Sequence, residues 1–187
     1  MRKIFLLAIC SVVLAACNNE KKDEPSSATT TPSATNDKKP ILEMMDMSSA
    51  DVVKKSYEAF SKGDIDGMTA DFADNIRYTW SGGDSLIGKA AVQDYWKKRW
   101  ALIDSLNFSE NIFVPILANE SQSKYAPTGK WILYWTLVNS KYKNGKKIMF
   151  WSHSVNHLTD AGKIDFVGMY YDRAPINKIT EGMTVPK

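Results

Sequence analysis

Two turn signals near the C-terminus set the strand pattern of the folded part of this chain. Asn144-Gly145 predicts a tight hairpin, because a type I′ turn needs positive φ at both of its central residues. A second turn is expected at residues 159–162, where the sequence is Thr-Asp-Ala-Gly. The apolar runs on either side of these turns are predicted strands, at 130–142, 146–159 and 164–172.

The chain contains only two histidines, His153 and His157, and both lie in the middle predicted strand. Their HxxxH spacing resembles a zinc site, because on a helix residues i and i+4 lie about 6 Å apart on one face. On a strand the same spacing covers about 13 Å, since each residue advances ~3.3 Å, so one ion cannot reach both rings. We therefore expect no metal.

Two helices are predicted at the start of the folded domain, and the second of them is short. Ser48 or Ser49 can cap the first helix, and Gly63 is placed to end it. Asp64 can cap the second helix. Its apolar face comprises Ile65, Met68 and Phe72.

A strand and the longest helix are predicted next. Residues 75–80 alternate between apolar and polar side chains, as a half-buried strand does. Residues 88–106 are predicted to form the longest helix, and residues 108–118 a strand in which Pro115 indicates an edge or a bulge. The apolar stripe of the long helix comprises Val92, Trp96, Trp100 and Ile103.

The N-terminus carries the pattern of an export signal. Arg2 and Lys3 precede an apolar run, residues 4–16, that is too short to span a bilayer and ends in small residues. The run continues into Cys17 as Leu-Ala-Ala-Cys, which resembles the lipobox of bacterial lipoproteins, where the cysteine is lipidated. A plain secretory signal cleaved near Ala16 is the alternative. We expect a signal peptide at 1–16, lipidated Cys17, and a membrane-anchored protein of the bacterial cell envelope, periplasmic or surface-exposed.

Composition then divides the mature chain into a tether and one domain. Residues 18–40 contain no aromatic or large aliphatic residue and are rich in Ser, Thr, Pro and charge, which is typical of a flexible linker. We expect the tether at 17–45 and a single domain at 46–187. Without Arg2 and Lys3 the formal net charge falls from +3 to +1, and no basic stripe indicates a nucleic-acid partner.

The order of the predicted elements, together with four short motifs, resembles a known superfamily. The motifs are Gly63-Asp64-Ile65-Asp66-Gly67, Phe72-Ala73-Asp74-Asn75, Gly88-Lys89-Ala90-Ala91-Val92 and Asp160-Ala161-Gly162-Lys163-Ile164. They are similar to the SnoaL-like and ketosteroid isomerase-like branch of the nuclear transport factor 2-like superfamily, over roughly residues 50–173. The resemblance implies an α+β fold: a cone-shaped, curved antiparallel β-sheet wrapped around N-terminal helices, as in a cystatin-like α+β barrel, with a pocket at the open end.

The catalytic residues of the isomerase are not found at matching positions. Its base, an aspartate, falls on Trp80, and its oxyanion-hole aspartate falls on Ser154. Its oxyanion-hole tyrosine falls on Ser56, with Tyr57 one residue away on a different face. An indole cannot act as a general base, and a serine replaces a protonated carboxyl poorly, so isomerase activity is not expected.

The same resemblance says which side chains face into the cone. Alternation groups the members of each strand on one face but cannot say which face is inside. Ser152, Ser154 and Asn156 form a polar row opposite the aromatic residues, and this row could orient a ligand by hydrogen bonds. In the alternative, the tryptophans only fill the cone. The predicted ligand-binding residues are Tyr78, Trp80, Trp96, Trp100, Trp135, Ser152, Ser154, Asn156, Met169 and Tyr171, with Leu137, Phe150 and Val167 beside them.

The opposite face of the predicted sheet does not alternate to polar residues, as a solvated face should. Such an apolar face suggests a partner, and members of the family often dimerise through this sheet, so a homodimer is expected. The residues assigned to this face are Met149, Trp151, His153, Val155, His157, Ile132, Tyr134, Thr136 and Val138, with Phe166 and Tyr170 nearby.

Three functions fit these patterns. The leading one is a membrane-anchored module that binds a small apolar or aromatic molecule in an aromatic pocket, without a cofactor. The second is an enzyme of the same fold, a dehydratase, cyclase or hydrolase, with Asp84 or Asp165 as its acid or base and Tyr78 or Tyr171 as a donor. The third is a dimeric interaction module with a filled cone.

Overall fold

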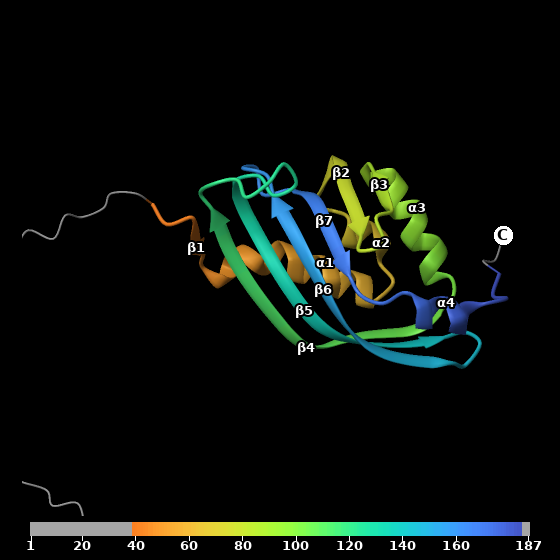
Figure 1. Cartoon of the computed structure of the whole chain (residues 1–187). Coiled ribbons are helices and arrows are strands. Elements are labelled where there is room, and N and C mark those ends of the chain that lie inside the picture. Colours follow the sequence, from red (N-terminus) through yellow and green to blue (C-terminus); the bar gives the residue numbers. More distant parts are fainter. Residues whose placement is uncertain (1–38, 185–187) are drawn as a thin grey trace, which may run out of the picture. The chain divides into compact units, whose positions relative to one another are not determined.

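The structure, a computed structural model, describes residues 39–184 (Figure 1). The predicted signal peptide, Cys17 and most of the predicted tether lie outside the described residues. Within residues 39–184, no helix is both long enough and apolar enough to cross a membrane.

Residues 39–184 form five helical segments, four of which are α-helices. A 3₁₀ turn, η1 (Met47–Ala50), leads directly into α1 (Asp51–Ser61), and Asp46 caps it by accepting a hydrogen bond of 2.8 Å from the Ser48 amide. The predicted serine cap is therefore wrong: Asp46 caps the 3₁₀ turn, and α1 follows with Ala50 at its N-cap and no side-chain cap of its own. Asp64 caps the second helix as predicted, accepting from the Gly67 amide at 2.7 Å. The remaining helices are α2 (Ile65–Met68), α3 (Lys89–Trp100) and α4 (Ala174–Thr180).

In the described part of the chain, seven strands form one sheet in the order β1-β4-β5-β6-β7-β2-β3. Neighbouring strands are antiparallel, except that β2 pairs with β7 in parallel. This is the expected α+β class, with one parallel pair in a sheet that we expected to be antiparallel throughout. The strands are β1 (Leu42–Met44), β2 (Phe72–Trp80), β3 (Ser85–Ile87), β4 (Ile103–Ala118), β5 (Gly129–Tyr142), β6 (Lys147–Leu158) and β7 (Ile164–Tyr170).

Several predicted boundaries are wrong. The long helix ends at Trp100, because Ile103 pairs with Tyr142 and starts a strand that continues to Ala118. The sheet begins at Leu42, inside the predicted tether, where β1 pairs with the end of β4. Strand β3 and helix α4 were not predicted at all. Strands β1 and β3 and helix α4 are short, so contacts with the rest of the domain stabilise them more than their own sequence patterns do.

The predicted orientation of β5 is also wrong. Ile132, Tyr134, Thr136 and Val138 are buried on the inner face, whereas Trp135 and Leu137 lie on the outer face. The register explains this, because Tyr134 pairs with Ser154 and Trp135 pairs with His153, and directly paired residues share a face. A shift of one residue in the family-based alignment reverses the assignment of every side chain in the strand.

The helices pack against the concave face of the sheet (Figure 1). Tyr57 of α1 makes edge contacts with Phe108 of β4 and Tyr134 of β5, at centroid distances of 5.1 and 4.4 Å. Helix α4 lies against the start of β4 and the end of β5, where Ile176 packs in a small cluster with Leu102, Ile103 and Tyr142. The core therefore extends from α1 to α4 along the inside of the sheet.

The orientation of β5 can be tested with two matched truncations. Ile132→Ala should lower the free energy of unfolding by about 2 to 5 kcal/mol, because it empties a fully buried site on the inner face. Leu137→Ala, on the same strand but facing out, should cost less than half as much. Urea unfolding measures both values. A larger loss for Leu137→Ala would reverse the assignment of the two faces.

Candidate functional site

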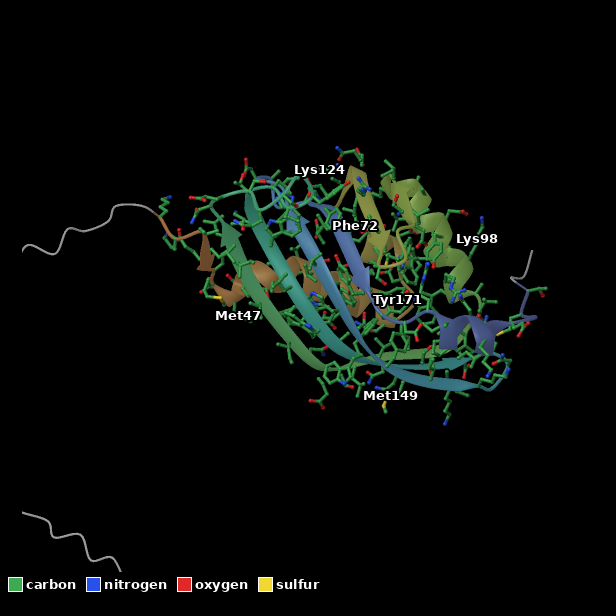
Figure 2. All side chains as sticks on the ribbon, in the orientation of Figure 1. Met47, Phe72, Lys98, Lys124, Met149 and Tyr171 are labelled. Atoms are coloured by element: carbon green, nitrogen blue, oxygen red, sulfur yellow. The ribbon has the colours of Figure 1, made fainter. Side chains whose placement is uncertain are left out.

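A cavity of about 80 Å³ lies between the concave face of the sheet and the helices. Every α-helix contributes to it, together with β2 and strands β4 to β7. Figure 2 shows Tyr171, one of its lining residues, on the helix side of the sheet, and Met149 on the opposite, outer side. The apolar part of the lining comprises Phe60, Met68, Phe72, Trp96, Ile103, Leu106, Phe108, Val138, Phe150, Val167, Met169 and Ile176.

A buried hydrogen-bond network closes one side of the cavity. The Tyr57 hydroxyl donates to Ser154 Oγ at 3.1 Å and also contacts the Met169 sulfur at 3.5 Å. Asn156 Nδ2 donates to the same serine oxygen at 3.1 Å and to the Ile132 carbonyl at 3.0 Å. These bonds fix the inner row of β6 against α1, so Asn156 and Tyr57 present fixed polar groups to the cavity.

Two other buried polar groups of the lining have no hydrogen-bond partner within the described part of the chain, the Trp96 indole N–H and the Ser140 hydroxyl. The hydroxyl of Tyr78 lies near Trp96 and that of Tyr142 near Ser140, but neither pair meets hydrogen-bond geometry. A buried polar group without a partner costs about 1 to 3 kcal/mol. The cavity therefore offers hydrogen-bonding capacity that the protein itself leaves unused.

The tyrosines of the lining are neutral phenols at physiological pH. Burial raises the pKa of Tyr78 and of Tyr57 well above the usual value, and burial raises the pKa of Tyr171 to about 12. Arg99 is the one charged residue of the described chain that lines the cavity, and the lining includes no aspartate, glutamate or histidine. The arrangement supplies donors and one cation, but no group that accepts a proton near neutral pH.

Six of the ten predicted site residues line the cavity, and four lie elsewhere. Ser154 lies one layer behind the lining, and Trp135 stacks on His153 on the outer face at 4.2 Å. Trp100 packs in the core, where its indole donates to the Phe60 carbonyl at 2.9 Å. Trp80 is buried between Tyr78 and Tyr95. Those in the lining are Tyr78, Trp96, Ser152, Asn156, Met169 and Tyr171.

Sequence reasoning missed four important members of the site, Tyr57, Arg99, Ser140 and Tyr142. Tyr57 faces the cavity, although the isomerase-based alignment put it on a different face of α1. Arg99 was missed although it lies three residues after Trp96, on the same side of α3. Ser140 and Tyr142 were missed because the outward assignment of β5 reversed their orientation. Helical spacing from Trp96 was the one signal that could have identified Arg99.

Neither aspartate considered as a catalytic acid or base reaches the cavity. Asp84 forms two hydrogen bonds with Arg173, at 2.7 and 2.8 Å, which hold the pKa of its carboxyl below the usual range. Asp165 Oδ1 lies 2.6 Å from His157 Nδ1. Both carboxylates are thus hydrogen-bonded to partners outside the lining.

The two histidines have separate environments. His157 also contacts the Thr128 carbonyl through Nε2, at 3.3 Å. His153 is stacked between Trp135 and Tyr170 on the outer face of the sheet. Among residues 39–184, no group of three or more His, Cys, Asp or Glu side chains is placed to hold a metal ion.

Comparison with known proteins agrees with this architecture. The family model of the SnoaL-like domain matches residues 53–166, more than half of the chain. Solved structures of the same fold include a nuclear transport factor 2-like protein of unknown function from Burkholderia pseudomallei, with a TM-score of 0.58 at 19% identity, covering 74% of this chain and 100% of that one.

Two further structures are similar. One is a candidate polyketide cyclase from Xanthomonas campestris, with a TM-score of 0.52 at 19% identity, covering 68% of this chain and 93% of that one. The other is a candidate isomerase from Bacillus subtilis, with a TM-score of 0.54 at 17% identity, covering 74% and 96%. A search of curated proteins gave no significant match. The match to the family model shows that this chain belongs to the SnoaL-like family, and the solved structures share its fold.

Proposed function

We propose that the domain binds a small molecule inside the cone and has no catalytic role of its own. The observation that carries this proposal is the pair of buried polar groups in the lining, Trp96 Nε1 and Ser140 Oγ, that have no protein partner within residues 39–184. A ligand with a hydrogen-bonding group would satisfy them and recover their desolvation cost. The apolar remainder of the lining would bury the rest of the ligand.

The size of the cavity limits the ligand. A cavity of about 150 Å³ holds benzene, and this one measures about 80 Å³. The conformation described here therefore suits a short-chain molecule. The aromatic ligand that we expect from the sequence would fit only if the residues lining the cavity moved outward. Helix α4, which contacts the cavity through Ile176, is one short element whose displacement would enlarge it.

An enzymatic role receives less support. Two structures of the same fold are candidate enzymes, a polyketide cyclase and an isomerase. Proton transfer needs a group whose pKa lies near the working pH. The polar side chains lining this cavity are neutral phenols, hydroxyls, an amide and an arginine, and the two aspartates considered for the role are hydrogen-bonded elsewhere.

The proposed ligand site can be tested with Ser140→Ala. Removing a buried hydroxyl that has no partner should raise the free energy of unfolding of the free protein by about 1 kcal/mol. The same change should weaken binding of butyramide or 1-butanol severalfold. Urea unfolding and isothermal calorimetry measure the two effects, with the exposed Ser85→Ala as the control that changes neither. If the parent protein binds neither probe nor phenol, the cone is filled by its own side chains.

We also propose that the domain is held at a bacterial membrane through lipidated Cys17, which lies outside the described residues. The support is the sequence Leu14-Ala15-Ala16-Cys17 after a charged and apolar start. A linker without large apolar residues then separates the anchor from the sheet, so the binding domain would work near the membrane without entering it.

Cys17→Ser should move the protein from the membrane fraction to the soluble fraction of the cell, because it removes the acylated residue. Fractionation followed by immunoblotting measures the distribution. Ser11→Ala, inside the apolar run, is a control that should leave the protein in the membrane fraction. Persistence of Cys17→Ser in the membrane fraction would contradict the lipid anchor.

The outer face of the sheet supports a third part of the proposal, a homodimer. Ile112, Trp135, His153 and Tyr170 form one continuous row across four strands, because each pairs with the next. Trp151 and Met149 continue the apolar surface and are 54% and 64% exposed. A second copy of this face is an apolar partner of matching chemistry, since the row contains no lysine, arginine or carboxylate.

Trp151→Glu should convert a dimer into a monomer without unfolding the domain. A carboxylate is costly at an apolar interface but is solvated on a free surface. Sedimentation velocity measures the mass, and circular dichroism checks the fold. The control is Lys147→Glu, which places the same charge near the hairpin end of the same strand. An unchanged sedimentation coefficient for Trp151→Glu would exclude this face as the interface.

A further inference from the structure

Within residues 39–184, Arg99 is the one charged side chain that lines the cavity, and it has no acidic partner there. Arg99 lies in the last turn of α3, three residues after Trp96, and lines the cavity with it. No carboxylate lies within ion-pair distance of its guanidinium in the described chain, and Arg99 is only half-buried. An arginine in this position can exchange its water for a ligand at low cost.

Three neighbouring cations, Lys97, Lys98 and Arg173, are paired with carboxylates elsewhere. Lys97 pairs with Asp66 at 2.9 Å, and Lys98 pairs with Asp94 at 2.7 Å. Arg173, the other arginine near this end of the domain, binds Asp84 through both terminal nitrogens and lies over the Trp80 ring. The C-terminal end of α3 carries a partial negative charge from the helix dipole, and Lys97 and Lys98 already interact with it favourably. The helix dipole therefore does not explain why Arg99 faces the cavity.

Two phenols border the guanidinium. Burial raises the pKa of Tyr142, and burial raises that of Tyr171 to about 12, while the nearby charge of Arg99 acts to lower both. Both tyrosines line the cavity and stay protonated, so their hydroxyls can donate. Tyr171 and Arg99 are both half-buried, which places this group where the lining reaches the surface. We call Arg99, Tyr142 and Tyr171 the mouth cluster.

We propose that the ligand is a small organic anion of the carboxylate class, whose charged end is bound by Arg99 in the mouth cluster while its apolar end enters the cavity. This inference rests on the proposed ligand-binding function and specifies the ligand's chemistry. A guanidinium matches a carboxylate with two parallel N–H donors, and adjacent phenol donors complete the oxygen's coordination. The absence of any acid from the described lining leaves nothing to repel such an anion.

The test compares matched anionic and neutral probes of the same size. Butyrate and butyramide form the short pair, and benzoate and benzamide form the aromatic pair. Dissociation constants are measured by isothermal calorimetry on the parent protein and on Arg99→Met, which keeps a long side chain but removes the charge. We expect Arg99→Met to weaken binding of the preferred anion about tenfold or more, and that of its amide less than twofold.

Two further measurements make the result specific. Lys98→Met, which removes an exposed and ion-paired cation from the same helical turn, should change neither constant. Raising the salt concentration should weaken anion binding to the parent protein and leave amide binding unaffected. The salt series uses the unchanged protein, so it decides the question even if Arg99→Met fails to fold.

The possible failures are distinguishable. If no probe of either pair binds the parent protein, the proposed ligand site itself is wrong. If the amides bind as tightly as the anions, without salt dependence, the ligand site stands and the anionic ligand is excluded. If the anions bind but Arg99→Met leaves their affinity unchanged, the charge is recognised at another place and the role assigned to Arg99 is wrong.

Discussion

The packing of Tyr57 into the concave face of the sheet is the contact on which the rest of the domain depends. Its ring lies against Phe108 and Tyr134, and its hydroxyl bonds to Ser154, so one residue of α1 joins β4, β5 and β6. The curved sheet needs an element on its inner side to bury its apolar residues. Because α1 occupies only part of that space, the cavity remains between α1, α3 and α4.

The polar groups around the cavity follow from the same packing. A phenol buried this deeply stays protonated, and the network through Asn156 holds the inner row of β6 in place. The lining therefore presents donors of fixed position in a low-dielectric space, where a hydrogen bond to a ligand contributes more than it would in water. With Arg99 at the rim, these features favour recognition of an acceptor or an anion over proton transfer.

The sequence predicted the features that local rules determine. The hairpin predicted from Asn144-Gly145 is present, with a hydrogen bond from the Tyr142 amide to the Lys146 carbonyl, but its turn is not the type I′ turn that we expected. Gly145 has a φ of 81°, whereas Asn144 does not have a positive φ, and the Gly145 amide donates to the Tyr142 carbonyl at 2.8 Å. Asp64 caps α2, and the four motifs led to the correct family and fold class. These signals need only neighbouring residues, so one sequence was enough to read them.

Features set by long-range packing could not be read in this way. Both faces of β5 are rich in large apolar residues, so alternation could not tell that Tyr134 faces inward and Trp135 outward. The end of α3 depends on the pairing of Ile103 with Tyr142, which lies far along the chain. The size of the cavity depends on how the aromatic rings interlock, and composition contains no information about that.

The central claim is that the cone contains a cavity that a small molecule can enter. Methyl NMR spectra of the protein during a butyrate titration test it most directly, because methionines lie both inside and outside the cavity. The account predicts saturable shifts for the methyl groups of Met68 and Met169, which line the cavity, and none for the exposed Met44 and Met149. Shifts confined to Met44 or Met149, or no shift at any methionine, would contradict it.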